Sequence, residues 1–345
     1  MKLSDIDKNF AVKTDFDREG LTFVDARELW LFGVFFDEGK YRRMPREAAE
    51  SVSEGVGILH SNTAGGRVRF KTDSPYIAIS VRSDLLSRMP HFSLTGTAGL
   101  DLYSEGRYLK TFIPPYEATD GFEGVYDTGS AELREYTLNM PLYSNVTELY
   151  VGIKEGSRIE PPDPYATELP VVFYGSSVTQ GGCASRPGCS YESILCNRLC
   201  CDHINLGFSG SAHGEIQMAE YIAGLPMSAF VMDYDYNAPT ALHLKKTHKP
   251  FFDIVRAKNP DLPIILMTRP LFYVSDADER RDIVLETYHT ALGEGDKNVY
   301  FIDGRELIGE VAEYGLVDGC HPNDAGFLCM ARAIEPTLRK ALKLL

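Results

Sequence analysis

The chain has 345 residues, of which 44% are hydrophobic and 24% charged, with a formal net charge of −14. This length corresponds to about two domains, and the composition is that of a folded protein rather than a disordered one. Both halves of the sequence are acidic, which disfavours nucleic acid or an anionic membrane as a partner.

The first part of the chain has the pattern of short β-strands. Its candidate strands are rich in β-branched and aromatic residues, and Gly-, Asn- and Pro-containing turns separate them at close spacing. Only residues 46–53 have a mildly helical pattern. Such a series of strands predicts an all-β sandwich or jelly roll. The predicted strands are residues 21–25, 66–70, 76–81, 100–103, 108–112, 134–138 and 148–153.

A proline-rich stretch follows at residues 156–170 and contains four prolines. Proline removes a backbone donor and stiffens the chain, so this stretch is a poor candidate for a regular element. We therefore expect a domain boundary near residue 160, with a β-sandwich domain over residues 1–160 and a second domain over residues 161–345.

The second half alternates strands and helices, which predicts a parallel, doubly wound α/β sheet. Ligands of such sheets lie at the carboxyl ends of the strands. The predicted strands are residues 171–174, 203–205, 229–232, 262–267 and 299–303. The predicted helices are residues 190–200 with Ser190 as the cap, 215–223, 242–258, 278–292 and 323–344 with Asn323 as the cap.

Candidate catalytic residues follow these strands. Ser177 lies in a Gly175–Gly181 turn after the first strand, where a serine is exposed and its own N–H faces an oxyanion. The same turn also fits a simple connection or a phosphate cradle. After the second strand, Gly210 has a backbone N–H that a ligand can approach closely. After the third, the Asn237 amide is a candidate donor, although a loop Asn often bonds its own backbone.

The last segment, Asp318-Gly-Cys-His-Pro-Asn323, precedes the final helix. An Asp and a His three residues apart in a tight turn can meet, so that the carboxylate orients the imidazole and leaves its other nitrogen free as a base. A turn aspartate beside a surface histidine is the simpler interpretation of this segment alone. Four such segments at four strand ends together supply every part of an acyl-transfer site.

These segments resemble, in order, the four blocks of the SGNH (GDSL-type) hydrolases. The resemblance covers about residues 170–345 and implies a flavodoxin-like five-stranded domain. It makes Ser177 the nucleophile, His321 the general base and Asp318 its orienting carboxylate. The oxyanion donors it implies are the backbone N–H groups of Ser177 and Gly210 and the side chain of Asn237.

The first half resembles a second family. Gly99-Leu-Asp-Leu-Tyr103 is similar to the GxDLY signature of a β-sandwich domain that precedes SGNH modules in two-domain esterases. Two positions depart from the SGNH pattern. Ser176 replaces the usual aspartate of the first block, and Ala238 stands where an aspartate usually follows the asparagine of the third. Neither change removes a catalytic group, but the hydrogen bonds that support these loops must differ.

We therefore expect a serine esterase that cleaves short-chain esters, acetyl esters foremost, of a polar substrate such as a carbohydrate. It needs neither cofactor nor metal, and its expected partner is a small-molecule or saccharide ester. An acyltransferase with the same triad is one alternative, and a non-catalytic carbohydrate-binding protein is another. Trp30, Tyr41 and Tyr103 are candidates for stacking on a sugar, although core packing is the more common role of such residues.

The remaining signals are weaker. All seven cysteines lie at or after Cys183, and their odd number and irregular spacing favour reduced thiols over a disulfide framework. A metal at Cys196, Cys200 and Cys201 lacks a second ligand pair, and Cys320 is a poor second nucleophile. His213 and His243 either line the cleft or lie in solvated loops. The start of the chain is charged, which leads us to expect no secretory signal and a cytoplasmic location.

Overall fold

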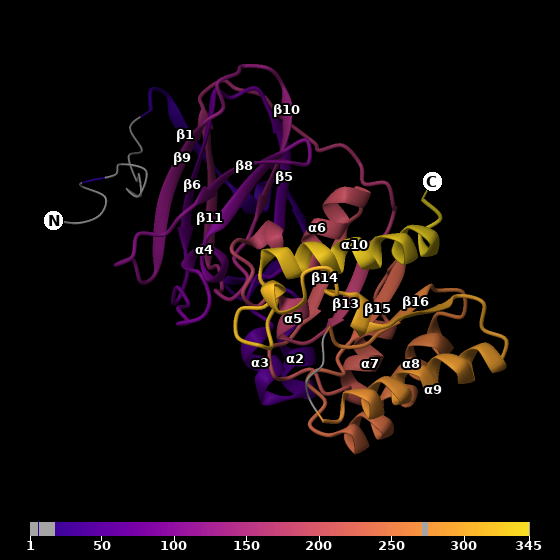
Figure 1. Ribbon diagram of the computed structural model, residues 1–345. Coiled ribbons are helices and arrows are strands. Elements are labelled where there is room, and N and C mark those ends of the chain that lie inside the picture. Colours follow the sequence, from indigo (N-terminus) through magenta and orange to yellow (C-terminus); the bar gives the residue numbers. More distant parts are fainter. Residues whose placement is uncertain (1–5, 7–17, 271–274, 345) are drawn as a thin grey trace.

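The chain folds into two parts that contain different kinds of β-sheet (Figure 1). The structure is a computed structural model that describes residue 6, residues 18–270 and residues 275–344. Antiparallel sheets occupy the N-terminal part, and a parallel sheet flanked by helices occupies the C-terminal part. The two parts pack side by side, with α6 (Tyr191–Leu199) facing the N-terminal strands.

The N-terminal part is a sandwich of two antiparallel sheets. The first has the order β1 (Leu21–Asp25), β11 (Glu148–Lys154), β6 (Tyr76–Arg82) and β9 (Gly121–Asp127). The second, six-stranded sheet has the order β12 (Ile159–Glu160), β5 (Arg67–Thr72), β10 (Arg134–Asn139), β7 (Leu100–Ser104) and β8 (Arg107–Phe112), with β2 (Trp30–Phe32) also paired to β5. The other elements are β3 (Phe35–Asp37), β4 (Lys40–Arg42), α2 (Arg46–Val52), α3 (Glu54–Leu59) and α4 (Leu94–Thr97).

Alternation along the strands gives the six-stranded sheet two different faces. In β10, Tyr136 and Leu138 are buried in the sandwich core, whereas Glu135, Thr137 and Asn139 belong to the opposite face. This is the two-residue period of side chains along a strand. The polar face is turned toward the C-terminal part, so the contact between the two parts is rich in charged and amide groups.

The C-terminal sheet has the strand order β14 (His203–Gly207), β13 (Val171–Gly175), β15 (Ala229–Asp233), β16 (Ile264–Met267) and β17 (Val299–Ile302), all parallel. This 2-1-3-4-5 order is the flavodoxin-like one, in which the chain reverses direction of winding beside the first strand. The helices are α5 (Ser177–Gln180), α6, α7 (Ile216–Ala223), α8 (Ala241–Lys258), α9 (Ala277–Gly293) and α10 (Asp324–Ala341).

The predicted architecture is confirmed, with local corrections. Every predicted strand forms, and the helices agree to within a few residues at their ends. Ser190 occupies the N-cap position of α6 as predicted, but its side chain makes no capping hydrogen bond, and its hydroxyl donates to Ser193 Oγ at 2.9 Å. Asn323 does cap α10, accepting from two backbone N–H groups. The sequence pattern did not predict the elements β2, β3, β4, α3, α4, β9 and β12. Of these, α3 and β9 each contain two glycines.

The GxDLY-like segment fastens the two parts together. Asp101 has no exposed surface, and its carboxylate accepts hydrogen bonds from Arg186 Nη1 at 2.8 Å, from the Gly188 N–H at 2.9 Å and from Asn139 Nδ2 at 2.7 Å. The ring of Tyr103 packs under the Arg186 guanidinium and against Gly188, where a Cβ would lie 2.3 Å from the tyrosine oxygen. The segment therefore docks the C-terminal part onto the sandwich.

Within the described ranges, no helix is both long and apolar enough to cross a membrane.

Candidate active site

The Ser177 loop is a tight turn between β13 and the one-turn helix α5. Ser176 occupies the N-cap position, and its hydroxyl accepts from the Val178 N–H at 3.1 Å. The serine that replaces the usual aspartate thus still satisfies a helix donor. Ser177 is the first helical residue, so its own N–H has no acceptor within the helix. Gly175 is required here, because a Cβ would lie 2.1 Å from Thr179 Oγ1.

Ser177, His321 and Asp318 form one hydrogen-bonded chain. Ser177 Oγ lies 2.9 Å from His321 Nε2, and His321 Nδ1 lies 2.8 Å from Asp318 Oδ2. The other carboxylate oxygen of Asp318 accepts from the backbone N–H groups of Cys320 at 3.0 Å and His321 at 2.8 Å. This is the arrangement that a serine nucleophile with an oriented imidazole base requires.

The electrostatics of Asp318 keep its carboxylate ionised. Partial burial acts to raise its pKa, but the hydrogen bonds from the His321 backbone and imidazole and from the Cys320 backbone outweigh this and lower the pKa to about 2. An ionised Asp318 fixes a proton on His321 Nδ1 and leaves Nε2 as the acceptor toward Ser177. The loop is further held by Tyr236, whose hydroxyl donates to the Cys320 carbonyl at 3.0 Å.

The predicted oxyanion donors lie on the two neighbouring loops. Gly210 is exposed, with a φ of 65°, in the loop that follows β14. Asn237 follows β15, and its Nδ2 donates to the Phe208 carbonyl at 2.9 Å, so one amide proton ties the third loop to the second. The second amide proton remains for a ligand. The structure thus shows a contact between loops rather than the bond of an Asn to its own backbone.

Buried polar groups replace the missing aspartate of the third block. Arg280 Nη1 donates to the carbonyl oxygens of Asp235 at 2.8 Å and Ala238 at 2.9 Å, one on each side of Asn237. The Asp235 carboxylate in turn accepts from the Arg269 N–H at 3.2 Å. These bonds hold the Asn237 loop from below, which is the support that Ala238 cannot give.

The N-terminal part braces the second block through Arg43. Its guanidinium is buried and donates to the Gly207 carbonyl at 2.7 Å and the Asn205 carbonyl at 3.0 Å. Gln180 acts from the first block, since its Oε1 accepts from the Ser209 N–H at 3.0 Å. The loop that carries Gly210 is therefore fixed from both sides.

His91 and Tyr143 reach the triad from the N-terminal part, and neither was predicted from the sequence. The His91 ring lies 5.8 Å from the His321 ring, centre to centre. The Tyr143 hydroxyl donates to the Ser177 carbonyl at 3.4 Å. No local motif marks these residues, because only the docking of the two parts brings them to the site.

Four side chains at the site have the donor types of a metal ligand set. One ligand atom each from His91, Cys183, Asp318 and His321 lies within 4.8 Å of the others. Both nitrogens of His321, however, are already engaged with Ser177 and Asp318. Burial raises the pKa of the Cys183 thiol to about 12, and Cys183 Sγ donates to the His91 carbonyl at 3.6 Å. Two members of this group, His321 and Asp318, are therefore committed to the hydrogen-bonded chain with Ser177.

The remaining candidates from the sequence are two histidines, three aromatic residues and the cysteines. His213 Nε2 is 3.0 Å from the Gly210 carbonyl, and His243 Nε2 is 2.8 Å from the His213 carbonyl, so both histidines support the second loop. Tyr41 is buried in the sandwich core, Trp30 is half-buried in β2, and Tyr103 is at the contact between the two parts. All seven cysteines are unpaired. Cys200 lies just beyond the end of α6 in a left-handed conformation.

Two family profiles match the sequence. Residues 168–339 match the GDSL-like lipase/acylhydrolase family. Residues 21–159 match the GxDLY family, described as the N-terminus of SGNH-hydrolase-type esterases. None of the curated proteins matches the chain.

Similar solved structures share the whole arrangement. A candidate GDSL-like lipase from Bacteroides ovatus is 30% identical, with a TM-score of 0.85 over 94% of this chain and 98% of that one. A salicylyl-acyltransferase from a tetracycline biosynthetic pathway is 21% identical, with a TM-score of 0.78 over 95% of this chain and 99% of that one. A family two carbohydrate esterase from Clostridium thermocellum is 15% identical, with a TM-score of 0.66 over 94% and 100%.

Proposed function

The chain belongs to the GDSL-like lipase/acylhydrolase family, and we propose that it is a serine esterase that removes short acyl groups, acetyl foremost, from a polar alcohol such as a carbohydrate. The observation that carries this proposal is the hydrogen-bonded chain from Ser177 Oγ through His321 to Asp318. We expect the oxyanion donors to be the Ser177 N–H and groups on the loops that follow β14 and β15, which carry Gly210 and Asn237.

In this mechanism Ser177 Oγ attacks the ester carbonyl carbon while His321 Nε2 takes its proton. The carbonyl oxygen becomes an oxyanion, which accepts hydrogen bonds from the Ser177 and Gly210 N–H groups and from Asn237 Nδ2. His321 then gives the proton to the leaving alcohol oxygen as the ester C–O bond breaks. Water attacks the acyl-enzyme by the same route and releases the acid. Asp318 keeps the imidazole oriented and stabilises the imidazolium in both steps.

Polar groups beside His321 support a polar alcohol. Because His321 protonates the leaving oxygen, the alcohol half of the ester must lie next to its ring. The side chains there are His91, Cys183 and Asp318, which suit a hydroxyl-rich group better than a lipid chain. The carbohydrate esterases among the similar structures agree with this class of alcohol.

A substrate series tests the acyl and alcohol preferences together. We expect faster turnover of p-nitrophenyl acetate than of the butyrate and octanoate esters, and release of acetate from acetylated xylose or cellobiose. A preference for octanoate would contradict the short-chain assignment while leaving the triad in place.

The same triad can pass the acyl group to an alcohol other than water, as the similar salicylyl-acyltransferase suggests. Product analysis with a competing acceptor alcohol separates the two reactions. We expect free acid as the main product in water-rich conditions. Predominant formation of a new ester would instead identify an acyltransferase.

A further inference from the structure

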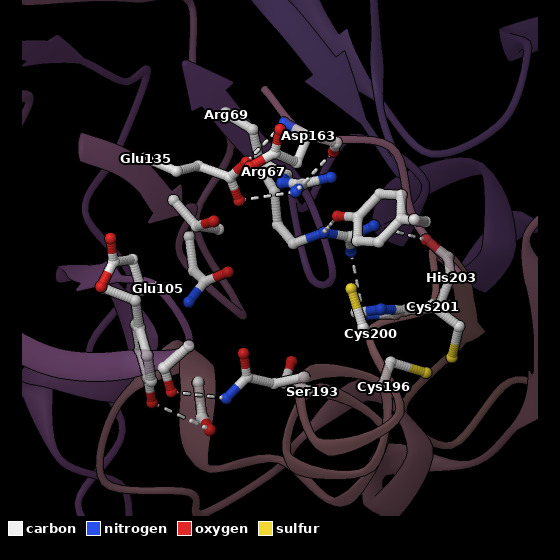
Figure 2. Close-up of a pocket in the computed structure, with 17 residues that line it drawn as sticks. Arg67, Arg69, Glu105, Glu135, Asp163, Ser193, Cys196, Cys200, Cys201 and His203 are labelled. Carbon is white, nitrogen blue, oxygen red and sulfur yellow. Dashed lines mark hydrogen bonds and ion pairs between the residues drawn. The ribbon is translucent and has the colours of Figure 1, made fainter. Parts of the chain in front are cut away.

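A cavity of about 330 Å³ lies between the two parts of the molecule (Figure 2). One wall is the polar face of the six-stranded sheet, with Arg69, Thr137 and Asn139. The facing wall is α6 and the residues after it, up to His203. The volume is at the lower end of the range for small-molecule sites, roughly 300–1,000 Å³. We propose that this interdomain cavity is a second, non-catalytic binding site for a neutral, hydroxyl-rich ligand, namely a saccharide unit.

The interdomain cavity is separate from the triad. His203 lines it and pairs with Val171 at the amino end of β13, whereas Ser177 follows Gly175 at the carboxyl end of the same strand. From Val171 to Gly175 the strand advances by four residues at about 3.3 Å each, so the two sites lie about 13 Å apart along β13. A ligand in the cavity therefore leaves the nucleophile accessible, and binding there does not depend on the proposed esterase activity.

The charges around the interdomain cavity favour a neutral ligand. Arg69 Nη2 pairs with Glu135 Oε1 at 2.6 Å, and Arg67 Nη2 pairs with the carboxylate of Asp202. Glu105 adds a further carboxylate on an exposed part of the lining. An anion would face these carboxylates, and a cation would face the two guanidinium groups. Asp163, which also lines the cavity, pairs with Lys71. The lining carboxylate outside these pairs is that of the exposed Glu105, so the buried part of the cavity offers an ion no unpaired opposite charge among the described residues.

Several polar atoms of the lining still have hydrogen-bonding capacity. Arg69 Nη1 is buried and has no hydrogen-bond partner within the described residues. Asn139 and Asn197 donate through Nδ2 to Asp101 and to the Gly106 carbonyl, which leaves the amide oxygens as acceptors. Hydroxyl groups can both donate and accept, so a saccharide can satisfy a guanidinium donor and several oxygen acceptors at once.

The guanidinium of Arg69 is held in place before any ligand arrives. It stacks on the Tyr165 ring at 4.0 Å and donates to the Asp163 carbonyl at 3.0 Å as well as to Glu135 (Figure 2). Arg67 is fixed in turn by the Tyr165 hydroxyl at 3.3 Å. Little side-chain freedom remains to be lost on binding, which favours affinity.

Alkylation of two cysteines tests the proposal in the unaltered protein. Cys200 is exposed and lines the interdomain cavity, and Cys320 is half-buried beside the catalytic His321. Iodoacetamide labelling is followed by peptide mapping with cellobiose, xylobiose or myo-inositol present. We expect at least one of these to slow alkylation of Cys200. Protection of Cys320 alone, or of neither cysteine by any of the three, would overturn the proposal.

Calorimetric titration of the same compounds into the wild type and into three variants locates the binding site. We expect Ser177→Ala to bind as the wild type does, Thr137→Trp to weaken binding at least tenfold by filling the cavity, and Thr137→Val to weaken it about threefold to tenfold through the loss of one hydroxyl. Because the tryptophan can disturb docking, melting curves of both Thr137 variants are compared with the wild type. Unchanged affinity in a folded Thr137→Trp protein, or loss of binding in Ser177→Ala, would refute the cavity as the site.

Discussion

Removal of the Asp101 carboxylate should destabilise the docking of the two parts. In Asp101→Ala, the Arg186 guanidinium and the Gly188 N–H both lose an acceptor in a buried contact. Breaking one partner of a buried ion pair destabilises a protein by about 3–5 kcal/mol. Because 21% of the Arg186 side chain is exposed, water compensates in part, and we expect a value near the lower limit, about 3 kcal/mol.

Differential scanning calorimetry measures this loss. An unfolding entropy of about 2.1 cal/mol/K per residue gives about 0.7 kcal/mol/K for a chain of this length, so about 3 kcal/mol lowers Tm by about 4 °C if the molecule unfolds as one unit. Asp73→Ala is the matched control, since it removes the carboxylate partner of the largely exposed Arg158. We expect that control to shift Tm by at most about 1 °C. Equal shifts of Tm for the two variants would refute the role of Asp101 in docking the two parts.

Three further variants test the site and its support. Asn237→Ala should fold normally and lower kcat by about 10²–10³, because one oxyanion donor is lost; unchanged kcat would exclude that donor. Asp318→Asn should lower kcat by about 10⁴ through the wrong imidazole tautomer. An Asp318→Asn protein with normal kcat would refute the role of Asp318. Since the pKa of Asp318 is about 2, any loss of wild-type kcat/KM between about pH 7 and pH 4 must come from another group. Burial raises the pKa of Glu192 from 4.5 to about 8. Between these two pH values the folded protein keeps a proton that the unfolded chain has lost. The free energy of unfolding therefore falls as the pH rises from about 4.5 to about 8. Glu192→Gln should therefore have a smaller decrease in Tm between pH 5 and pH 9 than the wild type, and an equal decrease would contradict the assignment.

The sequence predicted the parts of the site that depend on local structure. Serine, glycine and asparagine at strand ends and the Asp-x-x-His turn each come from a single segment, and the parallel sheet brings the strand ends together. Two of the elements that the sequence did not predict, α3 and β9, contain glycines that weaken the local pattern. In β9, for example, Gly124 is required because a Cβ would lie 2.7 Å from the Phe112 ring.

Contacts between the two parts could not be predicted from local patterns. His91 and Arg43 lie far from the catalytic segments in sequence, and only the docking of the sandwich places one beside His321 and the other under Gly207. The GxDLY-like segment was recognised as a motif, but its role depends on Arg186 and Gly188 in the other half. The interdomain cavity likewise has walls from both parts, and the sequence of neither wall alone indicates a pocket.

The most direct test of the account is to trap the acyl-enzyme. Wild-type protein is mixed with p-nitrophenyl acetate, quenched in acid and analysed by peptide mass spectrometry, with Ser177→Ala treated in parallel. We predict one acetyl group on the peptide that contains Ser177, a matching burst of p-nitrophenol, and neither signal in the variant. An acetyl group on another residue, or undiminished turnover by Ser177→Ala, would contradict it.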